Sequence, residues 1–435
     1  MNKFLIKGGS KLKGEIKAQG AKNEALQILC AVLLTSNNVT IKNIPNIVDL
    51  RELIELLRGL GVETSPLVDN TITLCAKSIN LDYLNSNDFL TRARKIRGSV
   101  MLLGPLLSRF GYVSIPNPGG DKIGRRKLDT HFNGLISLGA TYFYDENLQS
   151  HGLKSDNLKG KFIWLDEASV TGTANIIMAA VLAFGETCLY NAACEPYIQQ
   201  LCRMLNSMGA DIKGIGSNRL IINGVNELEG CTHEVMADMI EVGSFIGLAA
   251  ATNSNIIITN TRNIDLGVMI KTFETLGVNI HQNLDSIEIK KQGSLVVKEG
   301  LNGGIPTISD APWPGLTPDI ISILIVTAIY TKGTVLIHQK MFESRLFFVD
   351  RLIEMGGKII LCDPHRALVM GNNFDNKLNS ANLNSPDIRA GMALLIAAIS
   401  AEGTSVISNA QQIDRGYQNI ISRLRSIGVD ITRID

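Results

Sequence analysis

One pattern recurs six times along this chain of 435 residues. Each copy is an amphipathic segment that ends in an apolar residue and a glycine, and a short apolar run follows it. The copies are roughly 70 to 80 residues apart, a period longer than that of solenoid repeats and suited to a small α/β unit. Glycine is expected directly after a helix because the left-handed cap conformation costs it little. The six glycines are Gly61, Gly139, Gly209, Gly277, Gly356 and Gly428.

An Ala- and Leu-rich segment, a turn and an apolar run precede each copy, as in residues 175–192, 245–261 and 394–410. Apolar residues cover most faces of these segments, which predicts buried helices. Each unit therefore reads helix–strand–helix–strand. The fold class predicted is α/β: a two-domain inside-out α/β barrel of six similar units, three per domain, with the buried helices inside a shell of sheet. Chance similarity of helix–glycine–strand joints is the alternative, and six copies in one register weigh against it.

The repeat predicts where the domains lie. We expect residues 22–230 to form the first three-repeat domain, with a mobile loop at 112–124, and residues 1–21 plus 231–435 to form the second. Short hinges are expected near residues 19–22 and 228–232, because no low-complexity linker separates the halves. The active site is expected in the interdomain cleft.

Composition excludes several functions. A formal net charge of +1 gives no basic field for nucleic acid. The longest apolar runs, residues 320–330 and 392–401, are too short to span a membrane, and the first ten residues do not read as a secretory signal. The seven cysteines contain no Cys-x-x-Cys pair, which argues against a zinc cage or disulfide framework and favours a reducing, cytoplasmic compartment.

Two segments combine helix starts with positive charge. Gly20 to Asn23 open the first buried helix, where free N–H groups and Lys22 suit a phosphate, although a solvated lysine is the commoner explanation of such a pattern. Residues 118–131 run from a glycine-rich, proline-flanked stretch into the basic cluster Arg125, Arg126 and Lys127. Such a loop closes readily over a ligand and arginines grip phosphates, whereas the alternative is an ordinary surface loop.

Acid–arginine pairs recur in the second half of the chain. Residues 343–345 and 414–416 are expected to start second helices of their units, and Asp387 to Arg389 to open a first helix. A carboxylate there is a routine helix cap and its arginine is usually solvated. Three pairs in one predicted domain instead suggest an arginine clamp for a small anion, since guanidinium groups bind carboxylate and phosphate through paired hydrogen bonds.

The motifs GAKN, PGGDKIG followed by Arg126 and His131, ESR, DIR and IDRGY, in this order, closely resemble those of the UDP-N-acetylglucosamine enolpyruvyl transferases. The resemblance covers essentially the whole chain. It implies two domains of three similar units that close over phosphoenolpyruvate and UDP-N-acetylglucosamine. The implied reaction moves the enolpyruvyl group to the sugar 3-hydroxyl and releases phosphate, as the first committed step of peptidoglycan precursor synthesis. It implies no metal and no organic cofactor.

The resemblance also implies roles for individual residues. Lys22, Arg126 and Arg415 would hold the phosphate of phosphoenolpyruvate, with Arg345 and Arg389 on its carboxylate and Asn23 nearby. Asp319 would orient or deprotonate the sugar hydroxyl, and Asp387 would support the arginines. The catalytic set would be Asp121, Lys22, Asp319 and Arg415. The residues implied for UDP-N-acetylglucosamine are Asn23, Arg97, Arg126, Lys127, Leu128, Asp129, Thr130, Ser169, Val170, Thr171, Asp319 and Met341.

Two positions depart from the family pattern. Asp121 stands in the glycine-rich loop where many members have a cysteine, so a carboxylic acid would donate the proton and resistance to fosfomycin is expected. Glu167 stands where many relatives have a lysine near the nucleotide. Two other functions stay open: a shikimate-type enolpyruvyl transferase, and a non-catalytic UDP-sugar-binding paralogue. The sequence does not predict an oligomeric state.

Overall fold

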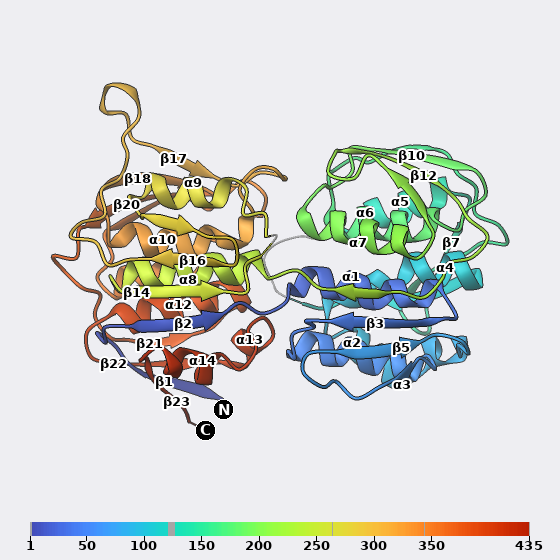
Figure 1. Cartoon of the computed structure of the whole chain (residues 1–435), viewed down its shortest axis with the longest axis horizontal. Coiled ribbons are helices and arrows are strands. Elements are labelled where there is room, and N and C mark those ends of the chain that lie inside the picture. Colours follow the sequence, from blue (N-terminus) through green and yellow to red (C-terminus); the bar gives the residue numbers. More distant parts are fainter. Residues whose placement is uncertain (1, 121–126, 263, 343, 435) are drawn as a thin grey trace. The chain divides into compact units, whose positions relative to one another are not determined.

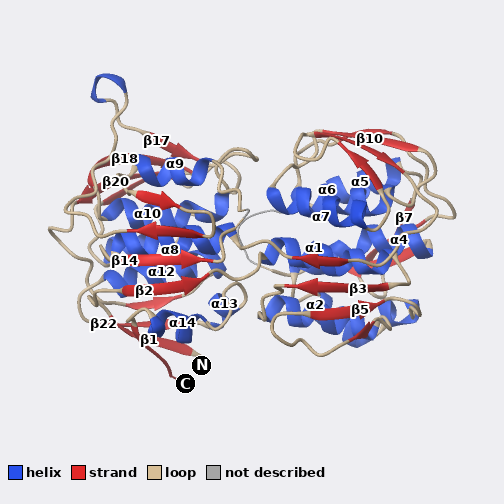
Figure 2. Ribbon diagram, viewed as in Figure 1, coloured by secondary structure: helices blue, strands red, loops and turns tan. Residues whose placement is uncertain are grey.

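The computed structural model describes residues 2–120, 127–262, 264–342 and 344–434. It is a mixed α/β structure of small sheets and short helices (Figures 1 and 2). The chain divides into two compact units. Among the described residues, unit 1 contains residues 2–19 and 237–434, and unit 2 contains residues 20–120 and 127–236. The domain bounds, hinges and cleft expected from the sequence stay predictions.

Unit 2 is built on three sheets in its described part, with strand orders β13-β3-β5-β4, β11-β12-β10-β9 and β6-β8-β7. Its strands are β3 (Asn38–Lys42), β4 (Glu63–Thr64), β5 (Ile72–Cys75), β6 (Tyr112–Pro116), β7 (Thr141–Asp145), β8 (Ser150–Lys154), β9 (Phe162–Trp164), β10 (Glu186–Tyr190), β11 (Asp211–Lys213), β12 (Arg219–Asn223) and β13 (Thr232–Glu234). Its α-helices are α1 (Lys22–Ala31), α2 (Val48–Gly59), α3 (Asn87–Ala93), α4 (Leu103–Phe110), α5 (Asp129–Ser137), α6 (Val170–Ala180) and α7 (Pro196–Ser207).

Unit 1 repeats this plan in its described part, with strand orders β21-β22-β1-β23, β15-β16-β14-β2 and β17-β18-β20-β19. Its strands are β1 (Lys3–Lys7), β2 (Lys13–Lys17), β14 (Asn255–Thr259), β15 (Ile280–Gln282), β16 (Ser286–Ile289), β17 (Thr307–Ser309), β18 (Lys332–His338), β19 (Ile359–Asp363), β20 (Arg366–Asn372), β21 (Asn382–Asn384), β22 (Thr404–Ser408) and β23 (Asp430–Ile434). Its α-helices are α8 (Met239–Ala251), α9 (Val268–Thr275), α10 (Ile321–Ile329), α11 (Val349–Glu354), α12 (Ile388–Ser400), α13 (Gln411–Asp414) and α14 (Ile420–Ser426).

The predicted fold class is confirmed in each unit. Every residue of α8, α10 and α12 is buried, and these three helices pack on one another inside the sheets of unit 1. In unit 2, α6 packs on α1 and α4. These helices are apolar on most faces because they contact other elements on all sides. The outer helices, such as α2 and α7, instead bury one face and leave polar residues exposed.

The repeat glycines share one backbone conformation. Gly61, Gly139, Gly209, Gly277, Gly356 and Gly428 all have a positive φ, between 82° and 106°. A side chain at such a φ is strained, which explains why glycine ends the second helix of every unit.

Three local predictions are wrong. Residues 112–116 of the predicted mobile loop form β6, which pairs antiparallel with β8. Arg345 lies in a turn before α11, which begins only at Val349. Asp414 ends α13 instead of starting a helix, because Gly416 and the left-handed Asn419 (φ 45°) interrupt the chain before α14. No helix in the described ranges is long and apolar enough to span a bilayer.

Candidate active site

Asp319 joins two of the predicted arginines in unit 1. It lies in a 3₁₀ turn (Pro318–Ile320) that leads into α10. Arg345 donates through Nη2 to Asp319 Oδ1, and Nη2 of Arg389 lies 3.2 Å from Asp319 Oδ2. The sequence predicted that Arg345 and Arg389 take part in one arginine clamp; the contacts of Asp319 with both arginines, from a distant part of the chain, are an additional finding of the structure.

Asp387 completes this cluster. As the N-cap of α12, its Oδ1 accepts from the backbone N–H groups of Arg389 (2.7 Å) and Ala390 (3.0 Å). The same Oδ1 lies 3.8 Å from Nη1 of Arg345. The cap thus fixes the first turn of the helix that carries Arg389 and places a carboxylate beside Arg345.

Two nitrogen donors of Arg345 are not used in hydrogen bonds within the described part of the chain. The residue is 8 % exposed, and its Nε and Nη1 have no hydrogen-bond partner among the residues that the structure describes. A buried guanidinium N–H without an acceptor is costly, so such atoms are expected where a ligand supplies the acceptor. An anionic carboxylate or phosphate meets this requirement.

Arg389 is held in its charged form. Burial alone lowers the pKa of a guanidinium, but the Asp319 carboxylate raises the pKa of Arg389 above its ordinary value. Tyr417 is hydrogen-bonded to Arg389, and burial raises the pKa of Tyr417 to about 12, so its hydroxyl keeps its proton. Arg415 lies two residues before Tyr417 and donates from Nη1 to Gln412 Oε1 at 2.8 Å.

Lys22 forms a second charged centre, in unit 2. It is the first residue of α1, as predicted, and is followed by Asn23. Its Nζ lies 2.7 Å from Oδ2 of Asp49, in the first turn of α2, and both side chains are buried. Asp49 could not be recognised as a partner of Lys22 from the sequence, because an acid in a first turn is a routine feature of helices.

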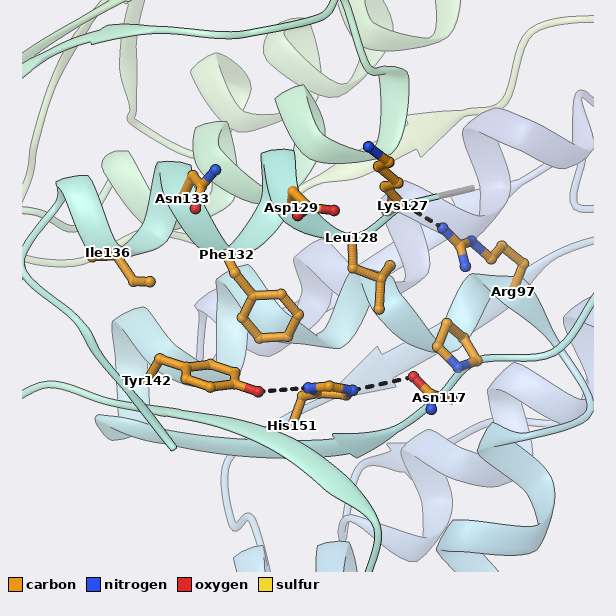
Figure 3. Close-up of a pocket in the computed structure, with 11 residues that line it drawn as sticks. Arg97, Asn117, Lys127, Leu128, Asp129, Phe132, Asn133, Ile136, Tyr142 and His151 are labelled. Carbon is orange, nitrogen blue, oxygen red and sulfur yellow. Dashed lines mark hydrogen bonds between the residues drawn. The ribbon is translucent and has the colours of Figure 1, made fainter. Parts of the chain in front are cut away.

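A pocket of about 530 Å³ lies within unit 2 (Figure 3). Four of its residues were predicted to bind the UDP-sugar, and the structure brings them together with seven that were not predicted. Arg97 and Lys127 contribute positive charge near one end, where Arg97 Nη2 is 3.5 Å from the Lys127 carbonyl oxygen. The lining residues are Arg97, Asn117, Pro118, Lys127, Leu128, Asp129, Phe132, Asn133, Ile136, Tyr142 and His151.

One edge of this pocket is a hydrogen-bonded row (Figure 3). Tyr142 Oη is 2.8 Å from His151 Nδ1, and His151 Nε2 is 3.2 Å from Asn117 Oδ1. Asn117 Oδ1 only accepts, so Nε2 carries the proton and Nδ1 accepts from the tyrosine. Partial burial lowers the pKa of His151, which favours this neutral form. Sequence alone did not reveal the row because its members lie on separate segments.

Beside the pocket, His131 supports the start of α6. Asn175 donates through Nδ2 to His131 Nδ1 at 2.8 Å, and His131 Nε2 is 3.1 Å from Thr171 Oγ1. Burial, reinforced by the charge of Arg97, lowers the pKa of His131 to about 3. The imidazole is therefore neutral and holds Thr171, one of the residues predicted for the sugar nucleotide.

The remaining described residues predicted to bind UDP-N-acetylglucosamine lie at or near the start of α6, except Met341. Ser169 is the N-cap of α6, with its Oγ accepting from Gly172 N at 3.3 Å, and Val170 is the first residue of that helix. Thr130 donates to Glu167 Oε1 at 3.4 Å, so the acid that departs from the family pattern contacts a predicted ligand residue. Met341 lies in unit 1, where its N–H donates to buried Asp310 at 3.1 Å.

Two predicted residues, Asp121 and Arg126, lie outside the described residues. Within the described ranges, no group of three or more His, Cys, Asp or Glu side chains is arranged to hold a metal ion.

Comparison with known proteins agrees with this fold. A family model described as EPSP synthase (3-phosphoshikimate 1-carboxyvinyltransferase) matches residues 6–424, and the chain belongs to this family. It is accordingly an enzyme, a transferase. Two relatives, from Bacteroides thetaiotaomicron (58% identical) and Porphyromonas gingivalis (57%), are named UDP-N-acetylglucosamine 1-carboxyvinyltransferase, and each alignment covers 100% of both chains.

Solved structures share the fold at low identity. The enolpyruvyl transferase NikO from Streptomyces tendae superposes with a TM-score of 0.84 at 21% identity, covering 99% of this chain and 98% of its own. An EPSP synthase from Acinetobacter baumannii gives 0.74 at 16% identity, with 100% of each chain covered.

Proposed function

We propose that this enzyme transfers the enolpyruvyl group of phosphoenolpyruvate to the 3-hydroxyl of UDP-N-acetylglucosamine and releases phosphate, at the first committed step of peptidoglycan precursor synthesis. The observation that carries the proposal is the cluster in which Asp319 joins Arg345 and Arg389, where two buried donors of Arg345 have no hydrogen-bond partner in the described part of the chain. The names of full-length relatives at 57–58% identity support the same acceptor.

The cluster suits the carboxylate of phosphoenolpyruvate. The Nε and Nη1 groups of Arg345 would donate to the substrate carboxylate. Arg345 and Arg389 would at the same time exchange their contacts with Asp319 for contacts with the substrate. Asp319 would then be released to accept a hydrogen bond from the sugar hydroxyl and to orient or deprotonate it. In this way substrate binding itself would prepare the base.

The phosphate and the proton are assigned to other residues. Lys22, Arg126 and Arg415 would bind the phosphate, and Asp121 would give a proton to the methylene carbon as the sugar oxygen attacks the adjacent carbon. The positive centre that develops lies beside two anionic groups, so fixed guanidinium groups lower the barrier by keeping those anions in place. In the elimination, the Asp121 carboxylate would take a proton back from the methyl group of the tetrahedral adduct as the phosphate leaves the adjacent carbon, which restores the double bond.

The unit 2 pocket suits the nucleotide of the acceptor. Phe132, Tyr142 and His151 offer flat surfaces for a base, while Arg97 and Lys127 provide charge for a diphosphate. Glu167 faces Thr130 at the margin of this region and contributes no favourable charge.

A phosphate-release assay tests the proposal. The unaltered enzyme is given phosphoenolpyruvate with either UDP-N-acetylglucosamine or shikimate 3-phosphate. We expect phosphate release only with the UDP-sugar. Release only with shikimate 3-phosphate would identify a shikimate-type enzyme, and calorimetric binding of the UDP-sugar without turnover would identify a non-catalytic paralogue.

A further inference from the structure

Gln19 binds the backbone on both sides of Tyr417. Its side-chain Nε2 donates to the Gly416 carbonyl oxygen at 2.8 Å, and its Oε1 accepts from the Gln418 N–H at 2.7 Å. The residue is 5 % exposed, so both bonds are shielded from water. An amide that donates to one peptide group and accepts from another fixes that segment at two points.

The bound segment needs such a partner. Residues 415–419 connect α13 to α14, and the N–H groups of Gly416 and Tyr417 donate to the Ile413 carbonyl oxygen at 3.0 and 3.1 Å. The Gly416 carbonyl oxygen and the Gln418 N–H instead need partners from another part of the chain, because leaving buried backbone groups unpaired is costly. The Gln19 side chain pairs with both groups, although it lies 397 residues from Gly416 and 399 residues from Gln418 in the sequence.

Gln19 is itself firmly held. Its backbone N–H donates to Glu241 Oε2 at 2.8 Å, and its carbonyl oxygen accepts from Asp238 N–H at 2.8 Å. Glu241 is fully buried and receives two bonds from Arg423, at 2.6 and 2.9 Å. These bonds fix the backbone of Gln19, and Gln19 in turn acts as a clamp on the peptide groups of Gly416 and Gln418.

The clamped segment carries Arg415 and contacts Arg389, two of the arginines proposed to bind phosphoenolpyruvate. Arg415 directly precedes Gly416, and Tyr417, between the two clamped peptide groups, is hydrogen-bonded to Arg389. The Tyr417 hydroxyl is also 2.9 Å from Ser244 Oγ. We infer that Gln19 is a positioning residue that sets the locations of Arg415 and, through Tyr417, of Arg389 for binding phosphoenolpyruvate. This inference rests on the proposed function for its substrate.

The test compares Gln19→Met, which keeps the length of the side chain but removes both bonds, with Asn206→Ala. Asn206 in unit 2 makes the same two-point clamp on another residue, donating to Ile212 O and accepting from Ile212 N at 2.9 Å each. Both variants lose two backbone-binding bonds, so a merely structural effect is common to both. Steady-state kinetics are measured for each substrate, and amide hydrogen exchange is measured for residues 416–418.

We expect Gln19→Met to raise the KM for phosphoenolpyruvate at least about tenfold, with the KM for UDP-N-acetylglucosamine changed less than about twofold. Exchange at the Gln418 amide should accelerate in this variant and not in Asn206→Ala. The inference is overturned if both variants change both KM values alike, or if Gln19→Met leaves the phosphoenolpyruvate KM within about twofold of its original value. Absence of turnover in the unaltered enzyme would overturn the proposed function. In that case the affinity for inorganic phosphate, measured by calorimetry, decides on Gln19: a weaker affinity in Gln19→Met alone supports the inference, and equal affinities overturn it.

Discussion

The ammonium group of Lys22 lies 2.7 Å from the carboxylate of Asp49, and both side chains are buried. A buried charge that loses one partner is destabilising by about 3 kcal/mol or more. We therefore expect Asp49→Asn to lower the free energy of unfolding by about that amount. If Lys22 binds phosphate, saturating inorganic phosphate should restore more stability to Asp49→Asn than to the unaltered enzyme.

Urea unfolding with and without phosphate measures both effects. Glu402→Gln is the control, because its partner Lys377 is exposed and such surface pairs contribute about 1 kcal/mol at most. Equal stabilisation of all three proteins by phosphate would contradict the role of Lys22.

The low pKa of His131 makes the stability of the folded enzyme depend on pH. Its pKa in the folded enzyme is about 3, below the ordinary value of 6.5, so the folded state resists its protonation. The stability that this group contributes is fully present above pH 6.5 and is lost as the pH falls toward 3, by up to about 1.4 kcal/mol per pH unit. The free energy of unfolding should therefore fall less steeply between pH 6.5 and pH 5 in His131→Asn than in the unaltered enzyme. An equal slope in both, with the exposed His281→Asn as control, would rule out this contribution.

Substitution of Tyr142, which lines the unit 2 pocket, tests whether this pocket binds the nucleotide. The residue is 43 % exposed and its hydroxyl pairs with His151, so Tyr142→Ala removes part of the pocket wall at little cost in stability. The KM for UDP-N-acetylglucosamine should rise about five- to tenfold, since one aromatic contact contributes about 1 kcal/mol, while the KM for phosphoenolpyruvate stays unchanged. Tyr190→Ala, which removes a ring that stacks on Trp164 elsewhere in unit 2, serves as the control. A rise of the same size in the control would show that the pocket has no special role.

Asp121 predicts the response to fosfomycin. An epoxide that inactivates by alkylating a thiolate has no thiolate to attack at this position. The enzyme should keep its activity during prolonged incubation, whereas Asp121→Cys should gain an adduct at residue 121 in peptide mass spectrometry. Covalent inactivation of the unaltered enzyme, with the adduct mapped near residue 121, would refute the prediction.

Asp121→Asn tests the proposed proton donor. This variant should abolish turnover and leave UDP-sugar binding nearly intact.

The fold was predictable because one physical constraint repeats. Each unit needs a left-handed residue after its second helix, and glycine at that position marks all six copies. The recurring acid–arginine pairs also suggested that Arg345 and Arg389 belong to one anion-binding clamp, whereas the contacts of Asp319 with both arginines were not predicted.

The remaining features depend on contacts between distant segments. Asp49, Tyr142 and Gln19 have local sequences with several ordinary explanations, and only the folded chain shows what each side chain meets. Helix boundaries at Arg345 and Asp414 were wrong because turns and short helices share the same apolar spacing.

The most direct measurement is kcat/KM for phosphoenolpyruvate in Arg345→Met, with UDP-N-acetylglucosamine as the acceptor. The exposed Arg351→Met, which loses only a surface pair with Glu354, is the control. We predict a fall of about 100- to 1000-fold for Arg345→Met, because a buried donor to the substrate anion is lost, and no change for the control. An Arg345→Met enzyme that keeps kcat/KM within about threefold of the unaltered value would contradict the proposed role of the arginine cluster.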